Sequence, residues 1–230
     1  ETRLGPKRAC TEGWVTLPAM RRCLVVTTAL ACLVGLPLVC FGGWEMVLVG
    51  AACVLFCFLY TTLLAQHGMG DVLVLLFFGL VPVCLTYYVT LPPASQTITA
   101  QVVWASLACG LVIDTLLVVN NYRDYDQDRA VGKKTLIVRI GRERAEQLYG
   151  WLGNIATCMM WGCLVLRDSS FVLMLVCFAC FVPYALLHGA TRVQMRRIGR
   201  GKELNKVLGM TARNMFVFGV TTAIVTLFIL

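Results

Sequence analysis

Long apolar runs alternate with short polar links along this chain. Each run holds roughly 20 residues, the length that an α-helix needs to cross a bilayer. The predicted helices cover residues 23–41, 45–65, 71–91, 100–120, 145–166, 171–187 and 207–230. Pro92-Pro93 ends the third run, because proline has no N–H to donate and disfavours helix in the residue before it. The pattern predicts an all-α integral membrane protein with a polar segment at 1–22 and one transmembrane domain at 23–230.

Charge follows the same alternation. The chain is 59% hydrophobic and 14% charged, a composition typical of membrane proteins, and its net charge is +8. Its Lys and Arg gather, with a couple of exceptions, in residues 1–22, 121–144 and 192–206. Counting helices places these segments on one side of the membrane, while the opposite loops carry only Arg167. The positive-inside rule therefore predicts that this side is cytoplasmic, and it explains the charge without a nucleic-acid partner.

The densest block of charge and amide groups begins where the fourth run ends, at Asn120. If that helix continues, Asn120, Asp124 and Asp128 lie four residues apart and stack on one face. Two carboxylates at this spacing repel each other unless a cation lies between them. Mg²⁺ suits such oxygen ligands, because it commonly binds through one or two carboxylates plus substrate phosphates.

Basic residues follow the two carboxylates. Lys133, Lys134 and Arg139 are placed where they could bind the outer charge of a phosphate group. The competing interpretation is a solvated loop whose acidic residues are neutralised by basic neighbours. The spacing, the double Asn and the position at a helix end favour the metal and phosphate site.

The block also carries a family resemblance. The pattern Asn-Asn-x-Arg-Asp-x-x-x-Asp from residue 120 to 128, with Gly-Lys-x-Thr-Leu from 132 and Arg-x-Gly from 139, resembles the second aspartate-rich motif of the intramembrane prenyltransferases. Within them it is most similar to the 1,4-dihydroxy-2-naphthoate polyprenyltransferases of menaquinone biosynthesis. The resemblance implies that Asp124 and Asp128 are catalytic and bind Mg²⁺. It also implies a set of diphosphate-binding residues: Arg123, Lys133, Arg139, Asn120 and Asn121.

A second stretch is similar to the same family. Tyr60-Thr61 is followed by Gly68-x-Gly70-Asp71, although the loop between them is shorter here and has lost its prolines. The resemblance implies that Tyr60 and Asp71, together with Tyr87 near the end of the third run, contact the aromatic acceptor. A tight turn and an aromatic residue at the membrane interface are the alternatives for this stretch and for Tyr87.

The resemblance implies a reaction and a place. A polyprenyl group would pass from polyprenyl diphosphate to 1,4-dihydroxy-2-naphthoate, with loss of diphosphate and CO₂, at the cytoplasmic face of a bacterial inner membrane. The family's helices, about nine in number, ring a central cavity, and this chain would supply about seven. A first aspartate motif is expected before Glu1, so the chain is expected to be part of a longer enzyme, to need a second polypeptide, or to be an inactive remnant.

Two alternatives stay open. The acceptor could be homogentisate or 4-hydroxybenzoate. The chain could also be a non-enzymatic membrane protein that uses Asp114, since an ionisable group within a spanning helix is a functional hypothesis by default. A hydrogen-bonded structural role is the competing interpretation for Asp114. The oligomeric state is not predicted.

Overall fold

A computed structural model describes residues 4–60, 64, 67–165 and 170–228, and these residues contain helices and no strand. In their described residues all seven predicted runs are mainly helical, which confirms the all-α prediction. Among the described residues, five stretches are long and apolar enough to cross a membrane: Leu17–Gly42, Gly70–Thr90, Ala100–Arg123, Phe171–Ile198 and Leu204–Leu227. The described residues do not include Arg3, Thr61 or Arg167, nor the predicted helix ends at 65, 166 and 230.

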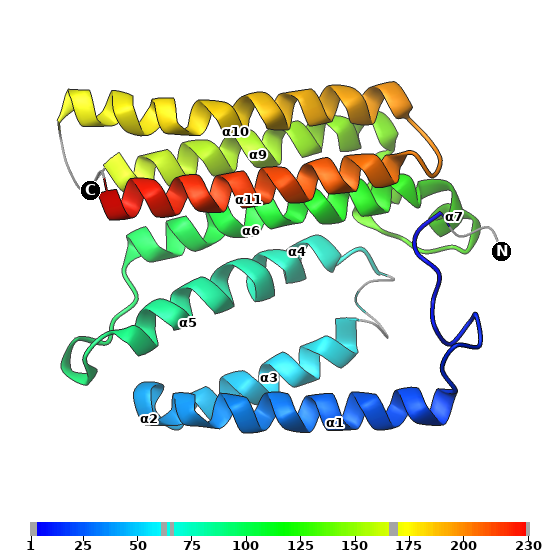
Figure 1. Cartoon of the computed structure of the whole chain (residues 1–230), viewed down its shortest axis with the longest axis horizontal. Helices are drawn as coiled ribbons and strands as arrows, with labels where there is room; N and C mark the ends of the chain where they lie inside the picture. Colours follow the sequence, from blue (N-terminus) through cyan, green and yellow to red (C-terminus); the bar gives the residue numbers. More distant parts are fainter. Residues whose placement is uncertain (1–3, 61–63, 65–66, 166–169, 229–230) are drawn as a thin grey trace.

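Four long helices pack side by side and form the body of the molecule (Figure 1). They are α6 (Ala100–Arg123), α9 (Arg142–Val165), α10 (Phe171–Ile198) and α11 (Leu204–Phe228). Helix α6 contacts α9 and α11, and α10 contacts the same two helices. The shared core includes Ala108, Ala156 and Phe181, all of which are fully or almost fully buried. We call these helices the four-helix bundle.

Several bundle helices are longer than predicted. Helix α10 was expected to end at residue 187 but continues to Ile198, and α9 and α11 each begin three residues early, at Arg142 and Leu204. The added turns of α10 carry a face that is buried against the rest of the bundle. In α10 this face holds Thr191 and Met195, which are inaccessible to solvent.

The third predicted run lies beside α6 as α4 (Gly70–Val74), a π-helical segment (Leu75–Leu80) and α5 (Val81–Thr90). Gly79 approaches α6 so closely that a Cβ atom on it would lie 2.7 Å from the carbonyl oxygen of Ser106. Small residues allow such close approach between helices in membranes. Leu91 then turns to an extended conformation before Pro92, as the sequence predicts.

The chain begins with a segment that crosses one end of the molecule and enters a separate helical hairpin (Figure 1). This N-terminal hairpin consists of α1 (Leu17–Gly35), a 3₁₀ turn (Leu36–Leu38), α2 (Val39–Gly42) and α3 (Glu45–Leu59). No residue of α1 or α3, both fully described, is buried. Many of their apolar side chains are exposed, as lipid-facing side chains are, although Phe56 of α3 contacts Phe77 with ring centres 5.1 Å apart.

Candidate active site

The aspartate block lies at the polar end of the four-helix bundle. Helix α6 ends at Arg123, and α7 (Tyr125–Ala130) follows after a junction at Asp124, whose backbone leaves the helical region at φ −86° and ψ 3°. The helix thus continues past Asn120 as far as Arg123 and is interrupted once, at Asp124. The four-residue spacing survives, because the Asp124 N–H donates to the Asn120 carbonyl at 3.1 Å and the Asp128 N–H donates to the Asp124 carbonyl at 2.8 Å.

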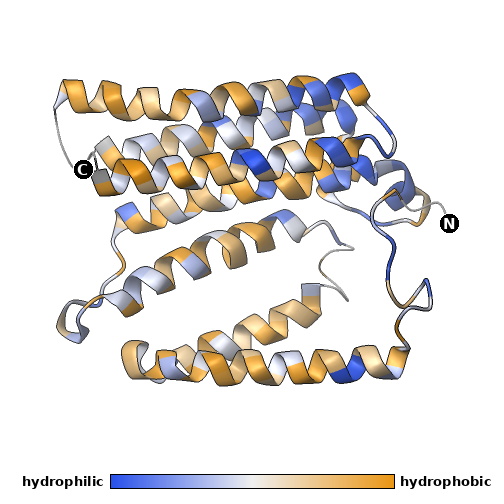
Figure 2. Cartoon of the chain, in the orientation of Figure 1, coloured by the Kyte–Doolittle hydropathy of each residue, from blue (hydrophilic) through white to orange (hydrophobic). Residues whose placement is uncertain are grey.

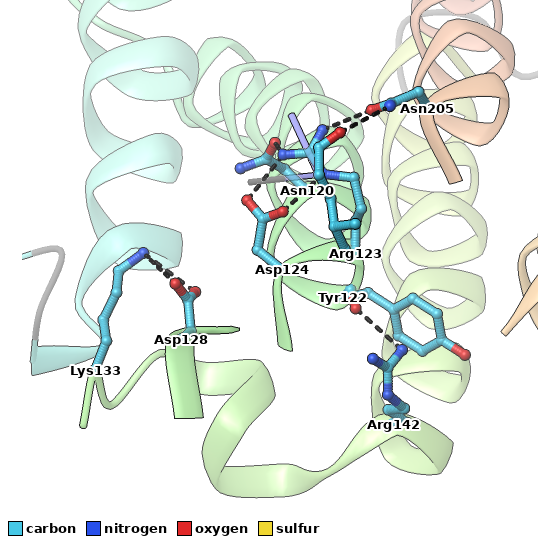
Figure 3. A network of polar contacts seen from close by, with 9 residues as sticks. Asn120, Tyr122, Arg123, Asp124, Asp128, Lys133, Arg142 and Asn205 are labelled. Atoms are coloured by element: carbon cyan, nitrogen blue, oxygen red, sulfur yellow. Dashed lines mark hydrogen bonds and ion pairs between the residues drawn. The ribbon is translucent and has the colours of Figure 1, made fainter. Parts of the chain in front are cut away.

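Arg123 organises the first half of the block (Figure 3). Its guanidinium is almost fully buried and binds both carboxylate oxygens of Asp124, at 2.7 and 2.8 Å. The same group donates to the side-chain oxygens of Asn120 at 2.8 Å and of Asn205 at 2.9 Å. Arg123 therefore fixes the position of Asp124, and a direct contact with a diphosphate would require these bonds to open.

Lys133 pairs with the second carboxylate (Figure 3). Its ammonium lies 3.2 Å from a carboxylate oxygen of Asp128. Gly132, with φ +72°, ends α7 in the left-handed conformation, and the N–H of Lys133 donates back to the carbonyl of Asp128. Burial raises the pKa of the Asp128 carboxyl, and the Lys133 ammonium partly offsets that effect.

A pocket opens beside this pair. It is partly open to solvent, and it brings together residues from three stretches of the chain: Tyr60, Gly68, Gly70, Asp71, Leu117, Asn121, Lys133, Thr135 and Leu136. The loop at Gly68 packs on the backbone of Lys134. Arg139, on the short helix α8 (Leu136–Ile140), donates to the carbonyl of His67 at 2.8 Å and ties that loop in place.

The structure thus gathers most of the predicted site residues. Asn121 and Lys133 share the pocket with Tyr60 and Asp71, whereas Asn120, Arg123, Asp124 and Asp128 lie in the adjoining network. Arg139 is exposed and supports the loop. Tyr87 does not join them. It lies 16 residues beyond Asp71 on the helical run Gly70–Thr90, about 24 Å away at 1.5 Å per residue.

Sequence reasoning gave no role to two residues that hold the site together. Asn205 accepts a hydrogen bond from Arg123 and donates one to the Leu4 carbonyl at 3.1 Å. The guanidinium of Arg142 lies 4.9 Å from the ring centres of both Tyr122 and Tyr125 and donates to the Gly199 carbonyl at 2.6 Å. Both act across tertiary contacts, for which one sequence carries no local signal.

The residues present fit a magnesium ion that shares its ligands with a phosphate. The described residues contain no group of three or more acidic, histidine or cysteine side chains suited to a metal. They do supply two carboxylates one helical turn apart, Asp124 and Asp128, with the amide oxygen of Asn120 beside the first. Mg²⁺ typically binds through one or two carboxylates, with substrate phosphates and water completing its shell.

Comparison with known proteins agrees with this chemistry. The family profile described as "UbiA prenyltransferase family" matches residues 3–205. The 1,4-dihydroxy-2-naphthoate octaprenyltransferase of Mycobacterium tuberculosis is 32% identical over 97% of this chain and 73% of its own length. The enzyme of the same name from Escherichia coli is 32% identical over 71% of this chain and 52% of its own length.

The chain therefore spans about half the length of the Escherichia coli relative and nearly three quarters of the mycobacterial one. No solved structure matches it. The family profile covers most of the chain, and the mycobacterial relative aligns with nearly all of it. As its aspartate block predicts, this chain belongs to the UbiA prenyltransferase family.

Proposed function

We propose that this chain takes part in transferring a polyprenyl group from polyprenyl diphosphate to 1,4-dihydroxy-2-naphthoate, with loss of diphosphate and CO₂. The relatives with this named activity support the proposal. The observation that carries it is the pocket, because Asn121 and Lys133 from the aspartate block meet Tyr60 and Asp71 there. A diphosphate at the block and an aromatic ring in the pocket would be neighbours.

The residues divide the work by position. Asp124 and Asp128 would hold Mg²⁺, which when bound supplies positive charge for the leaving diphosphate. Arg123 keeps Asp124 in place, and Lys133 lies between Asp128 and the pocket, where its ammonium can turn to a phosphate oxygen. Leu117 and Leu136 give the pocket an apolar wall. Such a wall protects an allylic cation from water.

The location of the site also supports a cytoplasmic active face. The hydrophilic residues gather at the end of the molecule that carries α7 and the N-terminal segment (Figure 2). That end holds the aspartate block, the start of α9 and the basic end of α10. We propose that it faces the cytoplasm, in a bacterial inner membrane, because positively charged loops are retained on that side.

The direct test is transfer of a labelled polyprenyl group in membranes or detergent, with and without Mg²⁺. The chain would be assayed alone and in a form lengthened upstream. We expect Mg²⁺-dependent transfer in at least one form, lowered about 100-fold by Asp124→Ala, because charge stabilisation at a leaving group contributes at this scale. Asp126→Ala is the matched control, since Asp126 is exposed and pairs with Arg142 outside the pocket. Absence of transfer from both forms, or transfer unaffected by Asp124→Ala, would contradict the proposal.

A further inference from the structure

Two buried carboxyls, one in the lining of the pocket and one behind it on α6, lie apart from the aspartate block. Asp71, at the start of α4, is 8% exposed, and Asp114, within α6, is 2% exposed. The Oδ1 atom of each is buried and has no hydrogen-bond partner in the described part of the chain. An ionisable group left unpaired inside a membrane protein is destabilising, so its retention points to a ligand that completes it.

The two carboxyls belong to one site. Gly70, next to Asp71, packs against Leu117 of α6 and the ring of Tyr60. Asp114 precedes Leu117 by three residues and so lies one turn deeper on the same side of α6. Asp71 and Asp114 therefore lie on the side of α6 that faces Gly70 and Tyr60.

The pocket is therefore polarised. Asp71 is the acidic residue of its lining, with buried Asp114 behind it on α6, whereas Lys133 and Asn121 belong to the aspartate block. A ligand that fits this arrangement has hydrogen-bond donors at one end and a negative charge at the other. A metal cation suits it less well, because the ammonium of Lys133 lines the same space.

We infer that Asp71 and Asp114 form the hydroxyl-binding end of the acceptor site. The hydroxyl of the ring remote from its carboxylate donates to this pair, and the carboxylate lies toward Lys133. Asp71 lines the pocket and makes the contact, while Asp114 acts behind it as a positioning residue. The inference rests on the proposed function, because it takes a hydroxylated aromatic carboxylate as the occupant.

The test compares two ligands that differ in one hydroxyl. Binding of 1,4-dihydroxy-2-naphthoate and 1-hydroxy-2-naphthoate to the full chain in detergent is measured anaerobically, by fluorescence of the naphthoate ring and without polyprenyl diphosphate. We expect a preference for the diol of at least about tenfold, the size of one hydrogen bond to a charged group. Asp71→Asn and Asp114→Asn should each reduce it to about threefold or less. The double variant should lose no more, because coupled residues are not additive.

Two controls separate this role from a structural one. Asp126→Asn makes the same chemical change at an exposed position and should keep the tenfold preference. Asp114→Asn should melt no lower than the unchanged chain, because it removes an unpartnered buried acid. A structural Asp114 would instead lower the melting temperature and leave the preference intact.

Two results would overturn the inference. One is an unchanged chain that binds both naphthoates equally, which decides the question even if the variants do not fold. The other is a full diol preference in both single variants. Because the assay needs no catalysis, a diol preference without prenyl transfer would count against the proposed function alone.

Discussion

The four-helix bundle and the N-terminal hairpin differ in how they are held. In the bundle, the ring of buried His188 stacks between Tyr149 and Tyr184, with ring centres 4.5 and 5.6 Å apart, and Asn214 donates to Thr191 at 2.8 Å. In the hairpin, none of the residues of α1 or α3 is buried. The hydroxyls of Thr27 and Thr28 in α1 donate hydrogen bonds only to backbone carbonyls of the same helix.

Hydropathy does not distinguish these regions. The stretch Leu17–Gly42 has a mean hydropathy of 2.4 and Phe171–Ile198 has 2.3, yet none of the first window is buried and 22% of the second is. Lipid tails are as apolar as leucine, so apolar character alone does not choose a neighbouring helix. Close contacts and interhelical hydrogen bonds do, and the bundle has both. The same substitution made in each region should therefore have a larger effect in the bundle than in the hairpin.

The largest difference is expected from adding one methyl group. A Cβ atom on Gly153, in α9, would lie closer than 3.0 Å to three ring atoms of His188, whereas one on Gly50, in α3, meets nothing within 4 Å. Gly153→Ala should therefore lower the free energy of unfolding by about 1–3 kcal/mol, as overpacked cores do. Gly50→Ala should leave it equal or slightly higher, because alanine favours helix. Thermal unfolding in detergent measures both, and equal effects would contradict the contrast.

A smaller difference is expected from removing one hydroxyl. Thr191 accepts from Asn214 and donates to the Leu187 carbonyl at 2.8 Å, so Thr191→Val leaves the buried amide of Asn214 short of a partner. The expected loss is about 0.5–1.5 kcal/mol, the range for interhelical hydrogen bonds in membranes. Thr28→Val in α1 should change the free energy of unfolding by only a few tenths of a kcal/mol, because the Thr28 hydroxyl bonds only within its own exposed helix. A loss as large at Thr28 would show that α1 has packed neighbours too.

The sequence predicts the helices well because hydropathy reports which segments enter lipid. It predicts their ends poorly for the same reason, since a helix such as α10 continues past its apolar run to Ile198. Helix α9 shows the other limit. It is 24 residues long and central to the bundle, yet it is not among the five stretches apolar enough to cross a membrane.

The contacts of the candidate site are likewise of two kinds, local ones that the sequence predicts and long-range ones that it does not. Asp124 and Asp128 are four residues apart, and Lys133 contacts Asp128 from five residues away after the turn at Gly132. Because these contacts join residues close in the chain, the sequence predicts them. The partner of Arg123 is Asn205, 82 residues away, and no pattern in a single sequence predicts that contact. Tyr87 shows the opposite case, in which a resemblance names a residue that the fold places far from the pocket.

The smallest effect on stability is expected where the two regions meet, at the N-terminal segment. Asn205 donates to the Leu4 carbonyl, and a Cβ atom on Gly5 would lie 2.9 Å from Nη2 of Arg123, so this segment covers the buried guanidinium. Asn205→Ala should remove this attachment and leave the bundle folded, because Asn205 is an exposed side chain at the bundle's polar end. Limited trypsin digestion should then cleave after Arg8 several-fold faster, since loosened termini are the preferred sites of proteolysis.

Asn154→Ala, a substitution of an exposed asparagine on α9, is the matched control and should not change the cleavage rate. Cleavage that stays slow in Asn205→Ala would mean that contacts other than Asn205 position the segment. Faster cleavage with an unchanged melting temperature would show that Asn205 holds the N-terminal segment without stabilising the bundle. Binding at the aspartate block and the placement of this segment would then depend on the same guanidinium, that of Arg123.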